Sequence, residues 1–125
     1  MKVFQSDKEY GGKNNFVDRN NVFVGYDTEQ DCCEDADWFI SDKVEKELPE
    51  TNQHDIDLSG YVFDTTYFKE NSEIQGDLDE GECVVFKLIK GNSELFLHLY
   101  NCHNGYYSHG FEMKIGDEII KEGYL

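Results

Sequence analysis

The chain has 125 residues, and its 27 acidic residues outnumber its 11 lysines and arginines, which gives a net charge of −16. This length suits one hydrophobic core, so we expect a single domain over residues 1–125. No run of 18 apolar residues occurs, and the first residues lack the apolar segment of a signal peptide. These features favour a cytoplasmic protein that does not contact a membrane. With one arginine and ten scattered lysines, the chain would repel a phosphate backbone, which argues against direct nucleic-acid binding.

The excess of acids is confined to two segments. Residues 27–57 hold twelve acids and two lysines, and residues 64–82 hold seven acids and one lysine. Elsewhere the charges balance, with eight acids and eight bases. One interpretation is a solvated surface that only keeps the protein soluble. The other is an acidic face that binds a basic partner.

The first quarter of the chain predicts two short strands. Residues 1–5 read as an edge strand, and residues 11–15 read as a loop because they contain glycine and asparagine. Residues 21–26 include Val22, Phe23 and Val24 and predict a second strand.

Residues 31–48 predict the one helix of the fold. Asp31 is a suitable N-cap, and Glu34 occupies the third helical position, as in a capping box. Apolar residues recur at helical spacing and form one stripe: Cys32, Cys33, Ala36, Phe39, Ile40, Val44 and Leu48. Pro49, the only proline, would end the helix. We expect the stripe to pack on a sheet, so that the acids of the first turns point outward.

The second half of the chain predicts the sheet. A strand is expected over residues 60–64, with a possible extension to residue 69. The apolar runs 82–90 and 94–103 flank Gly-Asn-Ser, which is typical of a β-hairpin. The first run is apolar on both faces, as in an interior strand, whereas in the second the leucines would face one side and the aromatics the other. Residues 107–115 alternate as a third strand, and residues 118–122 form a short last one.

These elements together predict an α+β fold. Its antiparallel sheet would be built on the C-terminal meander, with the helix at about residues 31–48 packed on it.

No motif with catalytic or metal-binding spacing stands out. The cysteine and histidine pairs are adjacent, whereas structural zinc sites use ligands spaced by two to five residues. A site that combines Cys102 and His109 is the one fallback for a metal or a reactive thiol. We therefore expect no cofactor and no enzymatic activity, and we keep a zinc- or thiol-dependent enzyme as the alternative from another class.

The candidate partner-binding residues combine clustered acids with nearby aromatics. Tyrosine and tryptophan suit protein recognition because they offer a large contact area and a polar group at low entropic cost. The candidates are Asp31, Glu34, Asp35, Asp37, Trp38, Asp77, Asp79, Glu80, Tyr106 and Tyr107.

Two resemblances bear on function. Residues 30–34, Gln-Asp-Cys-Cys-Glu, look like a motif of small uncharacterised proteins found in phage-like contexts, and this resemblance assigns no activity. The small, acidic, aromatic-rich chain without active-site motifs also resembles the immunity proteins of bacterial contact-dependent and polymorphic toxin systems. That resemblance implies a protein that neutralises a basic nuclease toxin by occluding its active site or substrate surface. The alternative is a phage-type DNA mimic that inhibits a restriction or CRISPR effector.

Overall fold

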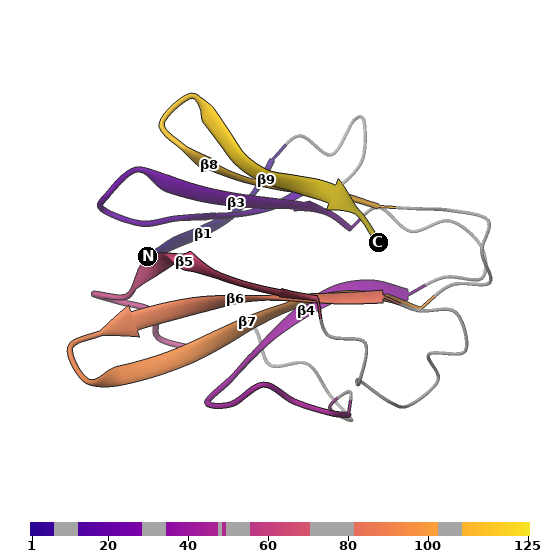
Figure 1. Cartoon of the computed structure of the whole chain (residues 1–125), viewed down its shortest axis with the longest axis horizontal. Helices are drawn as coiled ribbons and strands as arrows, with labels where there is room; N and C mark the ends of the chain where they lie inside the picture. Colours follow the sequence, from indigo (N-terminus) through magenta and orange to yellow (C-terminus); the bar gives the residue numbers. More distant parts are fainter. Residues whose placement is uncertain (7–12, 29–34, 48, 50–55, 71–81, 103–108) are drawn as a thin grey trace.

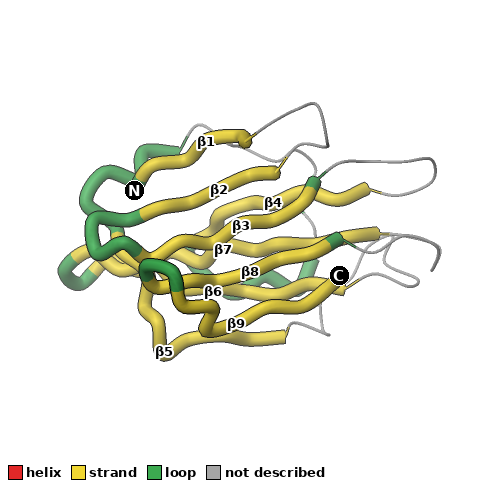
Figure 2. The backbone as a smooth tube through the Cα atoms, turned by 90° about the horizontal axis from the view of Figure 1, so that it is seen from above, coloured by secondary structure: helices red, strands yellow, loops and turns green. Residues whose placement is uncertain are grey.

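The computed structural model describes residues 1–6, 13–28, 35–47, 49, 56–70, 82–102 and 109–125. These residues contain nine strands: β1 (Lys2–Ser6), β2 (Lys13–Val17), β3 (Val22–Asp27), β4 (Asp35–Ser41), β5 (Val62–Glu70), β6 (Glu82–Lys90), β7 (Ser93–Cys102), β8 (Gly110–Ile115) and β9 (Glu118–Tyr124). No helix occurs among the described residues (Figure 2). The described part of the fold is therefore all-β.

The strands form two sheets that pack face to face as a β-sandwich (Figure 1). Sheet A has the order β1-β2-β3-β8-β9, and sheet B has the order β4-β7-β6-β5. All neighbouring strands are antiparallel. In sheet B, strands β5, β6 and β7 follow one another, while β4 precedes a long connection over residues 42–61 and pairs with β7. This arrangement is a Greek key.

The helix predicted over residues 31–48, and with it the α+β class, is wrong. The described residues of this stretch begin with strand β4, which pairs along its whole length with β7. Ala36, Trp38 and Ile40 face the core between the sheets, whereas Phe39 faces the outer side of sheet B. The helical stripe left Trp38 unexplained. A strand with apolar neighbours on both faces accommodates all four residues, and bulky aromatic residues favour strands.

The predicted C-terminal meander is correct for its first hairpin and wrong for its third strand. Strands β6 and β7 pair from Glu82 opposite Asn101 to Lys90 opposite Ser93. Strand β8 does not continue this sheet, because it lies in sheet A between β3 and β9. Alternating residues specify a strand without specifying its neighbour. Residues 103–109 give the chain enough length to cross between sheets packed about 10 Å apart.

Most other strand predictions are confirmed. Strand β1 is an edge of sheet A, and β3, β5 and β9 cover the runs predicted at 21–26, 60–69 and 118–122. The exception is β2, which covers part of the predicted loop at 11–15. Its sequence, Lys-Asn-Asn-Phe-Val, contains two asparagines, and asparagine is depleted in strands.

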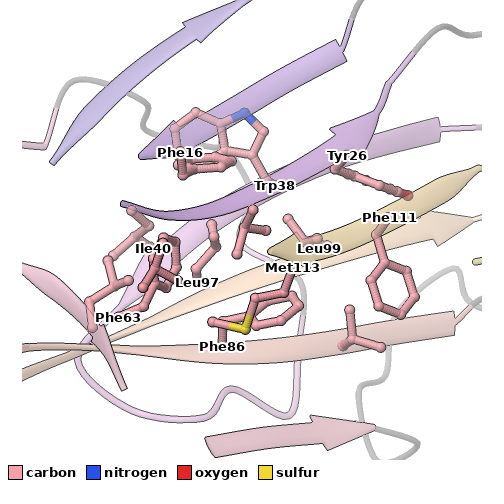
Figure 3. Close-up of a cluster of buried hydrophobic side chains, with 14 of the residues drawn as sticks. Phe16, Tyr26, Trp38, Ile40, Phe63, Phe86, Leu97, Leu99, Phe111 and Met113 are labelled. Carbon is pink, nitrogen blue, oxygen red and sulfur yellow. The ribbon is translucent and has the colours of Figure 1, made fainter. Parts of the chain in front are cut away.

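One hydrophobic cluster fills the space between the sheets (Figure 3). Phe16 of sheet A packs edge-on against Trp38 of sheet B, with ring centroids 4.9 Å apart. Leu97 and Leu99 of β7 are fully buried in this cluster, while Phe96 and Tyr100 pack on the outer side of sheet B. The alternation predicted for β7 is therefore confirmed.

Leu97→Ala is expected to lower the free energy of unfolding by about 2–5 kcal/mol, because it leaves a cavity between two packed sheets. Urea unfolding followed by Trp38 fluorescence measures the change. Ile119→Ala is the control, because Ile119 is 47% exposed, and it should shift the midpoint little. An unchanged midpoint for Leu97→Ala would contradict the position of this residue in the core.

Candidate functional site: the loop end of the sandwich

The two ends of the sandwich differ in how the strands are joined. At the turn end, on the left in Figure 1, short turns join β2 to β3, β6 to β7 and β8 to β9. One long connection, over residues 42–61 between β4 and β5, also starts and finishes there. At the opposite end, here called the loop end, four longer connections start and finish, over residues 7–12, 28–34, 71–81 and 103–109. Connections carried by a rigid sandwich are a common location for binding residues.

The connections of the loop end carry much of the charge. By sequence they hold nine acids and one lysine, a net charge of −8, which is half of the −16 of the chain. Residues 7–12, 29–34, 71–81 and 103–108 lie outside the described residues, so the structure places only the strand ends that they join. Those strand ends bring parts of both acidic segments back to the same end of the sandwich.

Most candidate partner-binding residues belong to these connections. Seven lie outside the described residues: Asp31, Glu34, Asp77, Asp79, Glu80, Tyr106 and Tyr107. Asp35 is the first residue of β4, and its side chain is not described. All eight therefore belong to chain segments that start or finish at the loop end.

The remaining two candidates have contrasting environments. Asp37 is partly exposed on β4, and its carboxylate accepts a hydrogen bond of 2.8 Å from the backbone N–H of Trp38. Trp38 is 4% exposed and contacts Phe16 in the core, so its side chain is not on the surface as an anchor for a partner. The period of two in β4 explains this outcome, because it turns neighbouring residues to opposite faces.

Buried polar groups hold the two sheets together at the loop end. The Tyr26 hydroxyl donates to the backbone oxygen of Tyr100 at 2.7 Å, which links β3 to β7. The Asn101 amide donates to the backbone oxygen of Leu125 at 3.1 Å, which links β7 to the end of β9. Since all these groups are shielded from water, each bond fixes the spacing between the sheets more firmly than an exposed one would. The sequence analysis missed these contacts. The signal was Asn101, because a polar residue at the end of an apolar run can indicate a buried hydrogen bond.

His109 closes the same network within sheet A. It is 3% exposed, and its Nδ1 lies 2.8 Å from the backbone oxygen of Asp27, to which a protonated Nδ1 donates. Its backbone N–H and oxygen both pair with Leu125 at 2.8 Å. These bonds join the end of β3, where one acidic connection begins, to the start of β8, where another connection finishes.

Asp18 performs the corresponding role at the turn end. Its carboxylate is 6% exposed and accepts three backbone hydrogen bonds. Two come from the β2–β3 turn, from Asn20 at 2.9 Å and Val22 at 3.0 Å. The third comes from Phe63 of β5 at 2.8 Å, so this carboxylate links the two sheets. Both ends of the sandwich are thus fixed by buried polar contacts.

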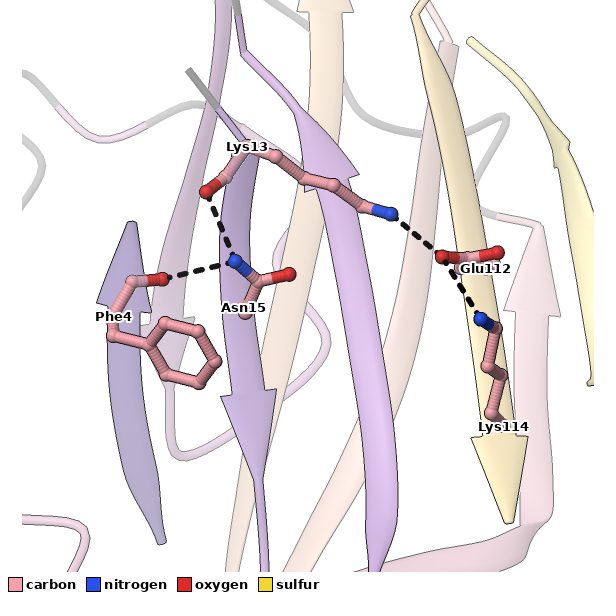
Figure 4. A network of polar contacts seen from close by, with 5 residues as sticks. All are labelled: Phe4, Lys13, Asn15, Glu112 and Lys114. Carbon is pink, nitrogen blue, oxygen red and sulfur yellow. Dashed lines mark hydrogen bonds and ion pairs between the residues drawn. The ribbon is translucent and has the colours of Figure 1, made fainter. Parts of the chain in front are cut away.

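The outer face of sheet A, in contrast to the loop end, carries balanced charges. Lys13 donates to Glu112 at 2.6 Å, and Lys114 lies 3.8 Å from the same carboxylate (Figure 4). The hydrogen bond from Lys13 lowers the pKa of Glu112 below its ordinary value. Both lysines also lie within 6 Å of the Phe23 ring, a cation–π arrangement. The strand pairing places three lysines and three acids on this face: Lys2, Lys13, Lys114, Asp27, Glu112 and Glu122.

The fallback metal or thiol site gains no further ligand. Among the described residues no group of three or more histidine, cysteine or acidic side chains could hold a metal ion. His109 is buried and bonded to Asp27, and the side chain of Cys102 lies outside the described residues.

A family model described as a domain of unknown function, DUF7448, matches residues 2–113. The chain belongs to the DUF7448 family. No curated protein and no solved structure matches it. In the described residues of this DUF7448 chain, no helix is long and apolar enough to span a membrane.

Asp18→Ala is expected to destabilise this DUF7448 protein by on the order of 3 kcal/mol, because three backbone N–H groups lose a charged acceptor. Thermal unfolding of the parent and the Asp18→Ala variant under identical conditions measures the loss of stability. Asp57→Ala serves as the control, since Asp57 lies near the same end but is exposed and bonds only to Ser59 in the described contacts. Equal melting temperatures for all three proteins would exclude this role for Asp18.

Proposed function

We propose that the protein is an acidic binding protein whose loop end occupies a basic surface of a protein partner. The observation that carries this proposal is the common origin of three acidic connections, over residues 7–12, 28–34 and 71–81, which start and finish at one end of the sandwich. The partner proposed is a basic nuclease toxin domain, and the activity proposed is that of an immunity protein. Such inhibition would take place in the cytoplasm, where the toxin would otherwise reach its nucleic-acid substrate.

Electrostatics supports this proposal in two ways. Acids concentrated at one end produce a directional field, which speeds the encounter with an oppositely charged surface. A nuclease must bind a polyanion, so its substrate site is basic and accepts clustered carboxylates in place of phosphates. The outer face of sheet A has no net charge on its paired strand positions and so does not compete for such a partner.

The rigidity of the scaffold supports the proposal as well. The contacts of Tyr26 and His109 fix the end of β3, from which the acidic connection over residues 28–34 leaves. Connections that leave from fixed points lose less conformational entropy on binding, which favours affinity. Buried hydrogen bonds make this end of the scaffold rigid, and a preformed binding surface needs a rigid scaffold.

The direct test of this function is protection from a toxin. Each gene that flanks the gene of this protein is expressed under an inducible promoter, with and without the protein. We expect one flanking product to stop growth alone, through nucleic-acid cleavage, and to be tolerated when the protein is present. Absence of a toxic flanking product, or toxicity that the protein does not relieve, would contradict the proposed immunity function. Protection against a restriction or CRISPR effector instead would identify the DNA-mimic alternative.

Charge reversal then locates the binding surface. The triple variant Asp77→Lys, Asp79→Lys and Glu80→Lys is expected to weaken binding to the protected toxin by at least about a hundredfold, because attraction becomes repulsion. Substitutions of acids in a connection between strands usually change stability little, so the melting temperature should stay near that of the parent. Titration calorimetry with a catalytically inactive toxin measures the affinity, and stopped-flow mixing at several salt concentrations measures the steering.

The matched control reverses three acids at the turn end: Asp57, Asp117 and Glu118. All three are exposed in the structure. Because each variant converts three acids to lysines, both variants change the net charge equally. We expect the control to bind nearly as tightly as the parent. Equal weakening by both triple variants would mean that net charge matters and the loop end does not.

A further inference from the structure

A short segment packs on part of the outer face of sheet B, beside Tyr67 and Phe96. Residues 42–47, here called the strap, follow β4 and lie over an outer apolar cluster made of Phe39, Cys83, Val85 and Tyr100. Each member of this cluster is at most 4% exposed, although the face points away from the core between the sheets. Val44 of the strap packs against the cluster. The outer cluster is therefore separated from the main core by the whole thickness of sheet B.

His98 of β7 lies at the centre of this face and anchors the strap. Its side chain is 0% exposed and stacks on the Phe39 ring, with centroids 4.2 Å apart and planes inclined by 10°. The backbone N–H of Glu45 in the strap lies 3.1 Å from Nε2 of the imidazole, and the backbone oxygen of Phe96 lies 3.1 Å from Nδ1. Both ring nitrogens therefore have a hydrogen-bond partner, Nε2 in the strap and Nδ1 in β7.

The two partners determine the protonation state of the ring. An N–H group can only donate, so Nε2 accepts from Glu45 and carries no proton. A carbonyl oxygen can only accept, so the single ring proton resides on Nδ1 and is donated to Phe96. The neutral imidazole satisfies both bonds at once. A second proton would have to reside on Nε2, where it would face the N–H of Glu45.

The surroundings also favour the neutral ring. Burial away from water lowers the pKa of His98 to about 4, against the opposing effects of the backbone groups of Phe96 and Phe39 and of the carboxylate of Glu45. Other ionisable groups on this face are Asp37 from β4, Tyr67 and Lys69 from β5, Cys83 and Lys87 from β6, and Glu94 from β7, which is paired with Lys87 at 3.0 Å. Glu45 is the acid that acts on the ring most directly, and its carboxylate accepts a hydrogen bond from Ser41.

We propose that the strap is an acid-sensitive latch, held closed by the neutral imidazole of His98 and released when Nε2 takes up a proton. Release uncovers the outer cluster of sheet B and leaves the sandwich folded, because the core between the sheets lies on the opposite side of β7. The protein therefore holds a second apolar surface that neutral solution keeps hidden, independent of the loop end.

The direction of the pH effect follows from the two protonation equilibria. In the open state the exposed imidazole has its ordinary pKa of about 6.5, whereas in the closed state the pKa is about 4. The open state binds more protons between these values, so the closed state loses stability as the pH falls below about 6.5. The loss is complete below about pH 4, and by then the open population has risen by about a hundredfold.

The chain contains separate reporters for the two surfaces. Trp38, the only tryptophan, lies in the core between the sheets and reports on global unfolding. Cys83 lies in the outer cluster and reports on the strap. Labelling by 4,4′-dithiodipyridine between pH 7.5 and 3.5 is measured on the Cys83 peptide by mass spectrometry, relative to an unstructured peptide. We expect Cys83 labelling to rise by about a hundredfold at pH values where Trp38 fluorescence is still native.

Two substitutions separate His98 from the neighbouring carboxylate. In His98→Gln the amide oxygen can replace Nε2 as an acceptor without titrating, so Cys83 labelling should lose most of its pH dependence. In Glu45→Gln the backbone N–H remains while the carboxylate is removed, so the rise in acid should persist. Protection of the Glu45 amide from hydrogen exchange, followed by NMR in the unsubstituted protein, reports the same opening without any substitution.

Two results would overturn the latch. One is a rise in Cys83 labelling that coincides with the loss of native Trp38 fluorescence, since the event would then be global unfolding. The other is Glu45 amide protection that stays constant down to pH 4 while the protein is folded. If Glu45→Gln abolished the rise and His98→Gln preserved it, the titrating group would be the carboxylate and the proposal would fail equally.

Discussion

The fold depends on covering both faces of the β6–β7 hairpin. Alternate residues of these strands are apolar on each side, and those on both sides are nearly inaccessible to water. A two-layer sandwich covers only the inner face of each sheet, so sheet B needs a second cover. Sheet A supplies the first, through Phe16, Met113 and their neighbours, and the strap contributes to the second through Val44. In the Greek-key order β4 and β5 lie at opposite edges of sheet B, so the connection between them has to pass from one edge to the other.

The sequence predicted best what local alternation determines. The turn after Lys90 and the faces of Leu97 and His98 follow from a period of two and a glycine-containing turn. Prediction from the sequence failed where the same apolar residues fit both a helical and a strand periodicity. Residues 36–40 are the example, because they suit a helical stripe and also a strand that is buried on both sides. It also failed for β8, since the choice between β7 and β3 as neighbours depends on which sheet needs Phe111 in its core. Such a choice is not local and leaves no pattern in the strand itself.

The candidate site shows the same division. Acidic segments are visible in any sequence, but only the strand order shows that residues 28–34 and 71–81 leave from one end of the sandwich. The sequence also treats all acids alike, whereas Asp18 is a buried link between sheets and Glu112 is paired with Lys13. Charge counted by residue type therefore overstates the acids available to a partner.

Buried hydrogen bonds at the loop end oppose the repulsion that the net negative charge of the chain produces. A net charge of −16 destabilises a compact chain by self-repulsion. The loop end, where three acidic connections start and finish, is also where Tyr26, Asn101 and His109 make buried hydrogen bonds between strand ends. These bonds do not depend on ionic strength as exposed ion pairs do, so they resist the repulsion when salt does not screen it. A basic partner would remove the same repulsion on binding. In the binding proposed above, relief of this repulsion would add to the driving force for association, while the buried contacts hold the strand ends in the free protein.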